Sequence, residues 1–310
     1  MLAPRPVPEV DWSGDHMSAP TTPLRLVLIG AGRVGTAVTE LLRRRGHEVA
    51  GVASRSTASA RRTAELLGTD SFDHLTMLPA ADVVFLGVPD GAIEEVAGEV
   101  AERLQPGSVV VHFAGTSGID PLAPVLDAGA GAAALHPVQA CPDVRSALER
   151  IPNSAWGVTA SGGLESWATD LVARELGGYP VVVAEEHRPL WHAAAMITSN
   201  GIAALLATGE ALLASIETEA PERVLGPLAA GTVASAEVGG GGAATLTGPV
   251  VRAESDVIAA HLEHIVRAAP HLVEDYARVV RFIVAAALSG RRIDEQTARR
   301  VLELVEERRG

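Results

Sequence analysis

Residues Leu26-Val-Leu-Ile-Gly-Ala-Gly-Arg-Val-Gly35 give the clearest indication of the fold of this chain. Its first four residues are apolar and are typical of a buried strand. The residues that follow, 33–45, have apolar side chains at helical spacing, which predicts an amphipathic helix. The sequence therefore passes from strand to helix through a turn that is rich in glycine.

The glycines of this turn form the pattern G-x-G-x-x-G. In a strand–turn–helix unit, Gly30 permits the tight turn, Gly32 lets the backbone approach a pyrophosphate, and Gly35 lets the helix pack closely on the strand. We expect the phosphates of a dinucleotide to lie at the start of the helix, in contact with Arg33 and Val34. Because the chain contains 31 glycines, a turn with a purely structural role is the alternative.

The second predicted strand, 48–56, ends in Ser54-Arg55-Ser56. In a dinucleotide-binding sheet the end of this strand meets the adenosine ribose. A guanidinium with hydroxyls suits a 2′-phosphate, whereas an acidic residue would favour the free hydroxyl of NAD. Ser54, Arg55 and Ser56 therefore indicate NADP rather than NAD, unless Arg55 is a solvated loop arginine.

Strands and helices continue to alternate along the first half of the chain. We predict strands at 82–88, 108–111, 131–135, 155–159 and 180–183, and helices at 93–100, 121–126 and 164–176. This alternation predicts an α/β domain with a parallel, doubly wound Rossmann-type sheet. Ligands of such sheets bind beyond the carboxyl ends of the strands, so we assign Val88 and Pro89 to the cofactor site.

Two of the predicted strands are followed by a histidine. We assign His112 to cofactor binding, and we expect His136, which precedes Pro137, to lie near the nicotinamide as a catalytic residue. Gln139 is a candidate substrate ligand. A histidine at a strand end can equally be a structural hydrogen-bonding residue, and both interpretations stay open. Cys141 has no basic neighbour in sequence, which favours a buried thiol.

The second half of the chain is predicted to be helical. A long helix rich in Ala and Leu spans 188–216, and further helices follow at 222–238, 256–268, 272–288 and 294–309. A long apolar helix is typical of the spine of a helical domain or of a dimer interface. The predicted organisation is a disordered tail over 1–23, a nucleotide-binding domain over 24–184 and an all-helical domain over 185–310, with Met17 as an alternative start.

Three polar residues interrupt the long apolar helix. Ser199 and Asn200 follow His192 by about two turns, so the three side chains can face one direction. Polar groups in such surroundings need a hydrogen-bonding partner or a ligand. They either contribute to a catalytic site or bind the loop 247–249, and the residues leave both alternatives open.

The composition argues against several classes of partner. A net charge of −13 disfavours nucleic acid and anionic membranes, both of which require a basic surface. The apolar runs are interrupted too often by charge or glycine to predict a membrane span. All 25 basic residues are arginines, so lysine is excluded from catalysis, and we expect no metal site. A single cysteine is typical of a cytoplasmic protein.

Five motifs together give the chain a resemblance to a known family. They are GAGRVGTAV from Gly30, VPDGAI from Val88, LHPVQ from Leu135, WHAAAMITSN from Trp191 and LTGPVVR from Leu246. Over residues 24–290 the chain resembles the bacterial Rossmann-like proteins with a C-terminal domain of unknown function 2520. These belong to a wider group of 6-phosphogluconate dehydrogenase-like, ketopantoate reductase-like and pyrroline-carboxylate reductase-like enzymes. The resemblance implies an NADP-dependent oxidoreductase with an active site between its domains, and a helical domain that forms a homodimer.

The resemblance also bears on single residues. β-Hydroxyacid dehydrogenase relatives have a lysine and, four residues later, an asparagine at the start of the second domain. Asn200 matches the asparagine, but Met196 stands at the lysine position and cannot relay a proton. The LHPVQ stretch is similar to the motif of prephenate dehydrogenase-like proteins in which a histidine, here His136, lies near the substrate. Arg252 is retained after LTGP, although the expected Arg-Gly-Asp is absent.

Three functions therefore stay open. The first is an NADP-dependent reductase of a small carbonyl or imine compound, and the second is a catalytically silent NADP-binding protein that senses redox state or scaffolds a partner. The third is a purely structural dimer without a cofactor. For the reductase we assign His192 or His136 as proton donor, Ser199 and Asn200 to orientation, and Arg252, Thr247 and Gln139 to substrate binding.

Overall fold

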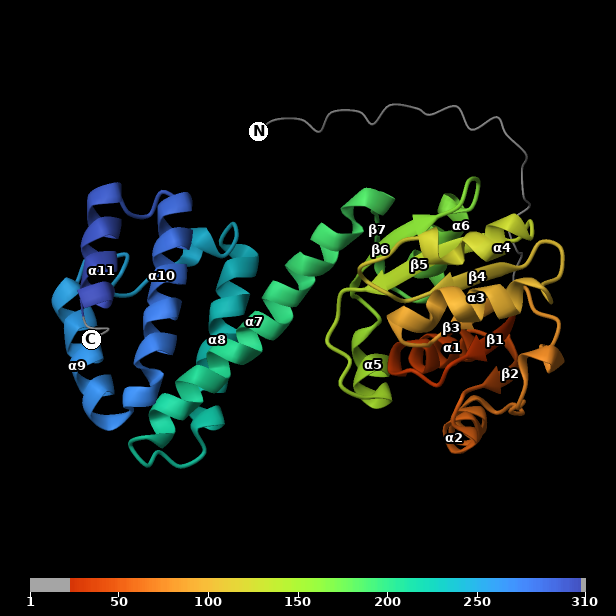
Figure 1. Cartoon of the computed structure of the whole chain (residues 1–310), viewed down its shortest axis with the longest axis horizontal. Helices are drawn as coiled ribbons and strands as arrows, with labels where there is room; N and C mark the ends of the chain where they lie inside the picture. Colours follow the sequence, from red (N-terminus) through yellow and green to blue (C-terminus); the bar gives the residue numbers. More distant parts are fainter. Residues whose placement is uncertain (1–22, 308–310) are drawn as a thin grey trace. The chain divides into compact units, whose positions relative to one another are not determined.

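The computed structural model describes residues 23–307 and contains two compact units, of which the first ends at Met196 and the second begins at Ile197 (Figure 1). The boundary lies within a single helix, α7 (Arg188–Ala214). The expected tail up to residue 22 and the alternative start Met17 lie outside the described residues.

The first unit contains a seven-stranded sheet in the order β2-β1-β3-β4-β5-β6-β7. The strands are β1 (Arg25–Ile29), β2 (Glu48–Ala53), β3 (Val83–Leu86), β4 (Val109–His112), β5 (Gly131–Pro137), β6 (Ala155–Ala160) and β7 (Tyr179–Val182). The helices are α1 (Arg33–Arg44), α2 (Thr57–Leu67), α3 (Ile93–Ala101), α4 (Ala123–Asp127), α5 (Val144–Arg150) and α6 (Glu165–Asp170), which continues as a π-helical turn (Leu171–Glu175).

Alternation along the central strands divides the core of this unit into two layers. Leu26 and Leu28 belong to a buried cluster with residues of α1, α2, α5 and α6, whereas Val27 and Ile29 belong to a second cluster with residues of α3 and α4. Helices therefore cover both faces of the sheet (Figure 1). This doubly wound arrangement confirms the predicted Rossmann-type class and explains why the strands are continuous apolar runs.

Two strands depart from the predicted parallel sheet, because β6 runs antiparallel to β5 and β7 runs parallel to β6. The connection between β5 and β6 contains the short helix α5, which was not predicted and which packs against α1. The chain thus returns to the end at which β5 stops, and the Val138 amide donates to the Ala155 carbonyl over 2.8 Å. This pairing also extends β5 to Pro137, so His136 lies within the strand rather than after it.

The strand order reverses between β1 and β3. From β1 the chain continues to the neighbour on one side, β2, and then crosses to β3 on the other side. In doubly wound sheets a crevice forms beyond the carboxyl ends of the strands at this point, and ligands bind there. The glycine-rich turn follows β1 directly and therefore stands at the reversal.

The second unit is helical among its described residues, in agreement with the prediction. It contains the rest of α7, α8 (Pro221–Val238), α9 (Ser255–Ala268), α10 (Val273–Ser289) and α11 (Glu295–Glu307). Its main core lies between α9, α10 and α11 and consists of aliphatic side chains such as Ile258, Val280 and Val301. Short 3₁₀ turns complete the chain at Leu75–Met77, Asp90–Ala92, Asp120–Leu122, Glu185–His187, Ala243–Thr245 and Pro270–Leu272.

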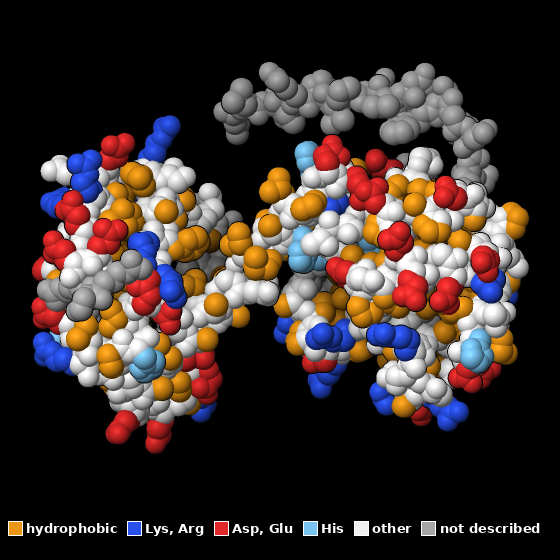
Figure 2. Space-filling model, viewed as in Figure 1, with side chains coloured by type: hydrophobic (Ala, Val, Ile, Leu, Met, Phe, Trp, Pro, Cys, Tyr) orange, Lys and Arg blue, Asp and Glu red, His pale blue; other side chains and the backbone are white. Residues whose placement is uncertain are grey.

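The helix α7 is not buried within the chain as the spine of a helical domain, and the other predicted role, a dimer interface, stays a prediction. Only Arg188 is buried along its 27 residues, and orange side chains lie exposed along it in Figure 2. Its apolar residues surround the whole helix, so one neighbouring layer cannot cover them all. Contrary to the sequence prediction, Glu185–Ala214 is long and apolar enough for a membrane span by length and composition alone, with a mean hydropathy of 1.3. Core helices of soluble proteins that meet this criterion are mostly buried, whereas none of this apolar window is buried among the described residues.

Candidate dinucleotide pocket and histidine pair

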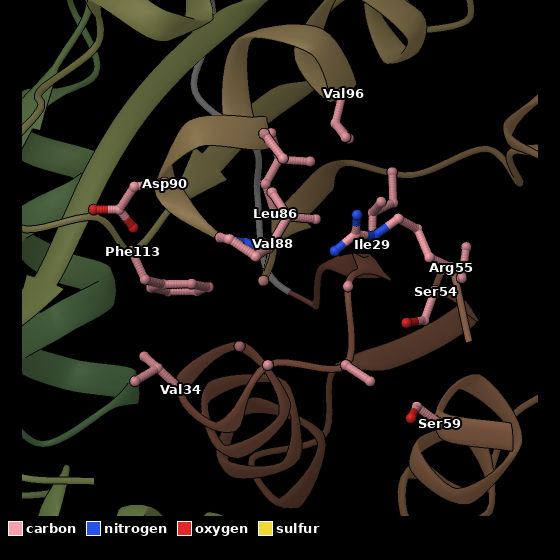
Figure 3. A pocket seen from close by; sticks show the side chains of 18 of the residues that line it. Ile29, Val34, Ser54, Arg55, Ser59, Leu86, Val88, Asp90, Val96 and Phe113 are labelled. Carbon is pink, nitrogen blue, oxygen red and sulfur yellow. The ribbon is translucent and has the colours of Figure 1, made fainter. Parts of the chain in front are cut away.

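A cavity of about 910 Å³ opens at the carboxyl ends of β1 and β3, in the first unit. Its walls come from the turn after β1, the end of β2, the start of α3 and the loop after β4. Figure 3 shows Ser54, Arg55 and Ser59 together on one side, and Val34, Asp90 and Phe113 on the other. The cavity therefore extends across the strand reversal, from the end of β2 to the end of β4.

Glycines make the floor of the cavity by close backbone contact. Gly30 has φ +90°, and a Cβ there would lie 2.6 Å from the carbonyl carbon of Gly87. A Cβ on Gly32 would lie 2.5 Å from the Gly87 oxygen. The two turns can approach this closely only because all three residues are glycines. Sequence analysis missed Gly87, although a glycine between a buried strand and Val88-Pro89 is a usable signal.

The helix α1 begins at the cavity without a side-chain cap. Gly32 occupies the N-cap position, no acidic residue stands in the first turn, and Gly32, Arg33, Val34 and Gly35 all line the cavity. Backbone N–H groups of a first helical turn have no intrahelical partner, and the helix dipole favours an anion there. This end of α1 is thus suited to hold a phosphate.

The two arginines of the cavity are held differently. The Arg33 guanidinium donates to the carbonyls of Cys141 and Pro142 over 3.3 and 2.9 Å, and so connects α1 to the loop after β5. Arg55 is exposed at the end of β2, beside Ser54 and Ser59. Ser56 caps α2 by accepting from the Ser59 amide and does not line the cavity. Arg55 is therefore better placed than Arg33 to meet a ligand anion.

The structure brings most of the predicted cofactor residues together. Val88 and Pro89 line the cavity, and so does Gln139, which was assigned to substrate. His112 does not line it. Lining residues that sequence analysis missed include Ser59 and His74, which are separated in sequence from the glycine motif and meet it only through the fold.

His112 has both ring nitrogens occupied by its own loop. Its Nδ1 accepts from the Ala114 amide over 3.1 Å, and its Nε2 therefore donates to the Gly118 carbonyl over 2.5 Å. The side chain is fully buried. Burial, together with nearby Arg188, lowers the pKa of His112 to about 4, although the bond to Gly118 opposes this. These contacts give His112 a role in shaping the loop 113–118.

The same loop connects the cavity to a second histidine. Phe113 and Ala114 line the cavity, and a Cβ on the next residue, Gly115, would lie 3.0 Å from His136 Nε2 and would collide with the His192 ring. The two imidazoles meet edge to face, with ring centroids 5.6 Å apart. The predicted catalytic residues His136 and His192 are thus brought together beside the loop that lines the cavity.

A buried arginine holds the surroundings of this pair. Arg188 is fully buried at the start of α7 and donates to the carbonyls of Ala114, Ser117 and Gly157 over 2.6, 3.1 and 3.1 Å. Burial lowers its pKa to about 10, although Glu185 opposes the shift. Arginine at that pKa is still charged at neutral pH. Sequence analysis did not single out Arg188, because its partners are distant backbone carbonyls.

The remaining predicted residues belong to the second unit. Ser199 and Asn200 are exposed on α7, and Thr247 is exposed in the loop before α9. Arg252 donates two hydrogen bonds to the Glu254 carboxylate, over 2.8 and 2.9 Å, so its guanidinium already has an anionic partner. Their assignment to the substrate stays a prediction.

Comparison with known proteins agrees with this architecture. Residues 13–137 match the Rossmann-like domain family, and residues 154–283 match the domain of unknown function DUF2520. This chain combines a Rossmann-like domain with a DUF2520 domain. None of the curated proteins compared with the chain matches it.

Three solved structures illustrate the shared fold. A proposed NADP oxidoreductase from Bacteroides fragilis (BF3122) is 24% identical, with a TM-score of 0.69 over 84% of this chain and 97% of that one. The protein TM1727 from Thermotoga maritima is also 24% identical, with a TM-score of 0.66 over 86% and 99%. A pyrroline-5-carboxylate reductase from Coxiella burnetii is 16% identical, with a TM-score of 0.57 over 91% and 99%. The chain therefore has the fold of NAD(P)-binding oxidoreductases, and a Rossmann-like domain indicates a dinucleotide.

Proposed function

We propose that this protein is an NADP-dependent oxidoreductase that reduces a small carbonyl or imine compound. The observation that carries the proposal is the loop 113–115, which lines the dinucleotide cavity with Phe113 and Ala114 and faces His136 and His192 with Gly115. A cofactor in the cavity and a substrate beside the histidines would then be neighbours.

The shape of the cavity supports a dinucleotide. Its glycine floor and the uncapped start of α1 suit a pyrophosphate. Ser54 and Arg55 after β2, with Ser59 in the first turn of α2, offer a guanidinium and hydroxyls to a 2′-phosphate, which supports NADP over NAD. The cofactor supplies the hydride chemistry when it is bound.

The protein's own task is to bind the substrate, exclude water and supply one proton. A hydride supplied by the bound cofactor would move the electron pair of the C=O or C=N bond to the oxygen or nitrogen, which would then need one proton from the protein. His192 and His136 are the ionisable side chains that meet beside Gly115. We assign the proton to His192, since His136 accepts a hydrogen bond at Nδ1 from the Trp191 indole over 3.2 Å.

A catalytically silent NADP-binding protein is the second candidate, and Met196 at the position of the lysine of β-hydroxyacid dehydrogenases favours it. NADPH oxidation across a panel of 2-keto acids and cyclic imines separates the two. We expect turnover by the wild type and a loss of at least about 100-fold in His192→Ala and His136→Ala. Tight NADPH binding without turnover of any substrate would contradict the reductase.

A further inference from the structure

Resting on the proposed function, we propose that Trp191 is a positioning residue that holds His136 as an uncharged hydrogen-bond donor to a substrate carbonyl oxygen. The proposal stands on the contacts of the two rings in the first unit. Nothing in the sequence had assigned a role to Trp191.

The contact with Trp191 determines which ring nitrogen of His136 carries the proton. The Trp191 indole nitrogen can only donate, and its N–H points at His136 Nδ1 over 3.2 Å. Nδ1 must therefore carry a lone pair, which places the single ring proton on Nε2. A second proton would turn Nδ1 into a donor facing a donor, so this contact disfavours the imidazolium.

Groups near the His136 ring also affect its protonation. Arg188 and His192 on α7 are the charged and titratable groups that act on His136, and both disfavour its protonation. Arg188 Nη1 binds the carbonyl of Gly157, the residue that pairs with His136 in the neighbouring strand. Burial is the largest effect, and together these causes lower the pKa of His136 to about 4. His136 is therefore neutral at physiological pH.

The N–H of His136 that Trp191 leaves free is the one at Nε2. Nε2 lies on the side of Gly115, where a Cβ would come within 3.0 Å of it. Gly115 follows Phe113 and Ala114, which line the dinucleotide cavity, so we place the carbonyl oxygen of the substrate beside this N–H. An uncharged donor there can bind a carbonyl oxygen, which becomes more negative as hydride arrives. A protonated imine has an N–H of its own, so it would place one hydrogen-bond donor against another, the Nε2–H of His136.

The position of the indole depends on a second glycine. A Cβ on Gly157 would lie 2.6 Å from Trp191 Nε1, so this strand residue leaves the space that the indole N–H requires. Two different changes can therefore break the same contact. Trp191→Phe removes the N–H and keeps an aromatic ring, whereas Gly157→Ala displaces the indole.

The test is a long-range nitrogen–proton correlation spectrum of the full chain with ¹⁵N-labelled histidine, with His136 assigned by loss of its signals in His136→Gln. We expect the wild type at pH 7 to show only the Nε2–H tautomer. In both Trp191→Phe and Gly157→Ala the two tautomers should mix, and in Trp191→Phe, which leaves Arg188 in place, the titration midpoint of His136 should rise. Trp167→Phe, which alters a tryptophan of α6, should leave the spectrum unchanged.

The spectra and the kinetics can each overturn a part of this proposal. A protonated Nδ1 in the wild type, or a wild-type spectrum in folded Trp191→Phe, overturns the proposal. Among substrates, a higher kcat/KM for cyclic imines than for 2-keto acids overturns the assignment to a carbonyl. Absence of turnover with all of them contradicts the proposed function, while the spectrum still judges the tautomer.

Discussion

At the scale of single residues, His112 shows how a buried imidazole connects stability to pH. Its two ring nitrogens hold the Ala114 amide and the Gly118 carbonyl, so a second proton would displace the Ala114 amide. The pKa of about 4 in the folded chain lies below the ordinary value of 6.5. The unfolded chain therefore binds this proton first as the pH falls.

We predict that the free energy of unfolding decreases as the pH falls from about 6.5 to about 4, because protons then favour the unfolded chain. His112 should contribute on the order of 3 kcal/mol to this loss. Urea unfolding at several pH values should show a weaker pH dependence in His112→Gln than in the wild type. Parallel pH profiles for the two proteins would show that His112 titrates normally in the folded state.

Gly115 is a second residue whose effect can be measured directly. A Cβ there would collide with His192 and approach His136 Nε2, so Gly115→Ala should displace both rings and fill the space beside them. We expect kcat/KM to fall about 100-fold with little change in NADPH affinity. Gly98→Ala is the control, since a Cβ on Gly98 meets no atom within 4 Å. Equal activity of Gly115→Ala and Gly98→Ala would show that the space beside Gly115 is not part of the active site.

At the scale of elements, the loop after β4 is held by a carboxylate from the segment before α7. Glu185 accepts from the amides of Gly118 and Ile119 over 2.7 and 2.6 Å. Hydrogen bonds to an ionised acceptor are stronger than neutral ones. The loop that faces the histidine pair is thereby fixed from two sides, by Glu185 and by Arg188.

Glu185→Ala should therefore lower the free energy of unfolding by about 2 kcal/mol and reduce turnover, because two loop amides lose their acceptor. Its exposed neighbour provides a matched control, and Glu186→Ala should stay within about 0.5 kcal/mol of the wild type. Chemical denaturation of the three proteins measures the difference. Similar stabilities of both variants would mean that water replaces the carboxylate without cost.

The elements themselves follow largely from the sequence, whereas their contacts do not. The apolar runs and helical spacing that predict β1, α1 and α7 are local patterns, and the structure confirms these elements within a few residues. The direction of β6 depends on where α5 packs, which no local pattern expresses. The contacts of Trp191 with His136, and of Arg188 with three carbonyls, join residues at least 31 positions apart and likewise have no local signal.

At the scale of the whole molecule, the exposed apolar surface of α7 and α8 supports the proposal of a homodimer. Large side chains exposed by 44 to 73% include Leu190, Ile197 and Leu205 of α7, and Leu228 of α8. Helices that are apolar on all sides are usually buried in an assembly or a membrane.

We predict that the wild type sediments as a dimer at micromolar concentration and that Leu228→Glu shifts it to monomer, because a buried charge without a partner opposes association. Leu66→Glu is the matched control on α2 and should remain dimeric. Sedimentation velocity measures both. A monomeric wild type in aqueous buffer would contradict the dimer, and recovery of the protein with lipid vesicles would instead favour a membrane surface.

We propose that the cavity at the strand reversal holds NADP, and calorimetric titration with NADPH and NADH measures this binding. We predict that the wild type binds NADPH more tightly, that Arg55→Asp loses about 10- to 100-fold in NADPH affinity with little loss for NADH, and that Gly32→Ala binds neither. The exposed Arg145→Asp should behave as the wild type. Tighter binding of NADH by the wild type, or full NADPH affinity in Gly32→Ala, would contradict the binding of NADP in this cavity.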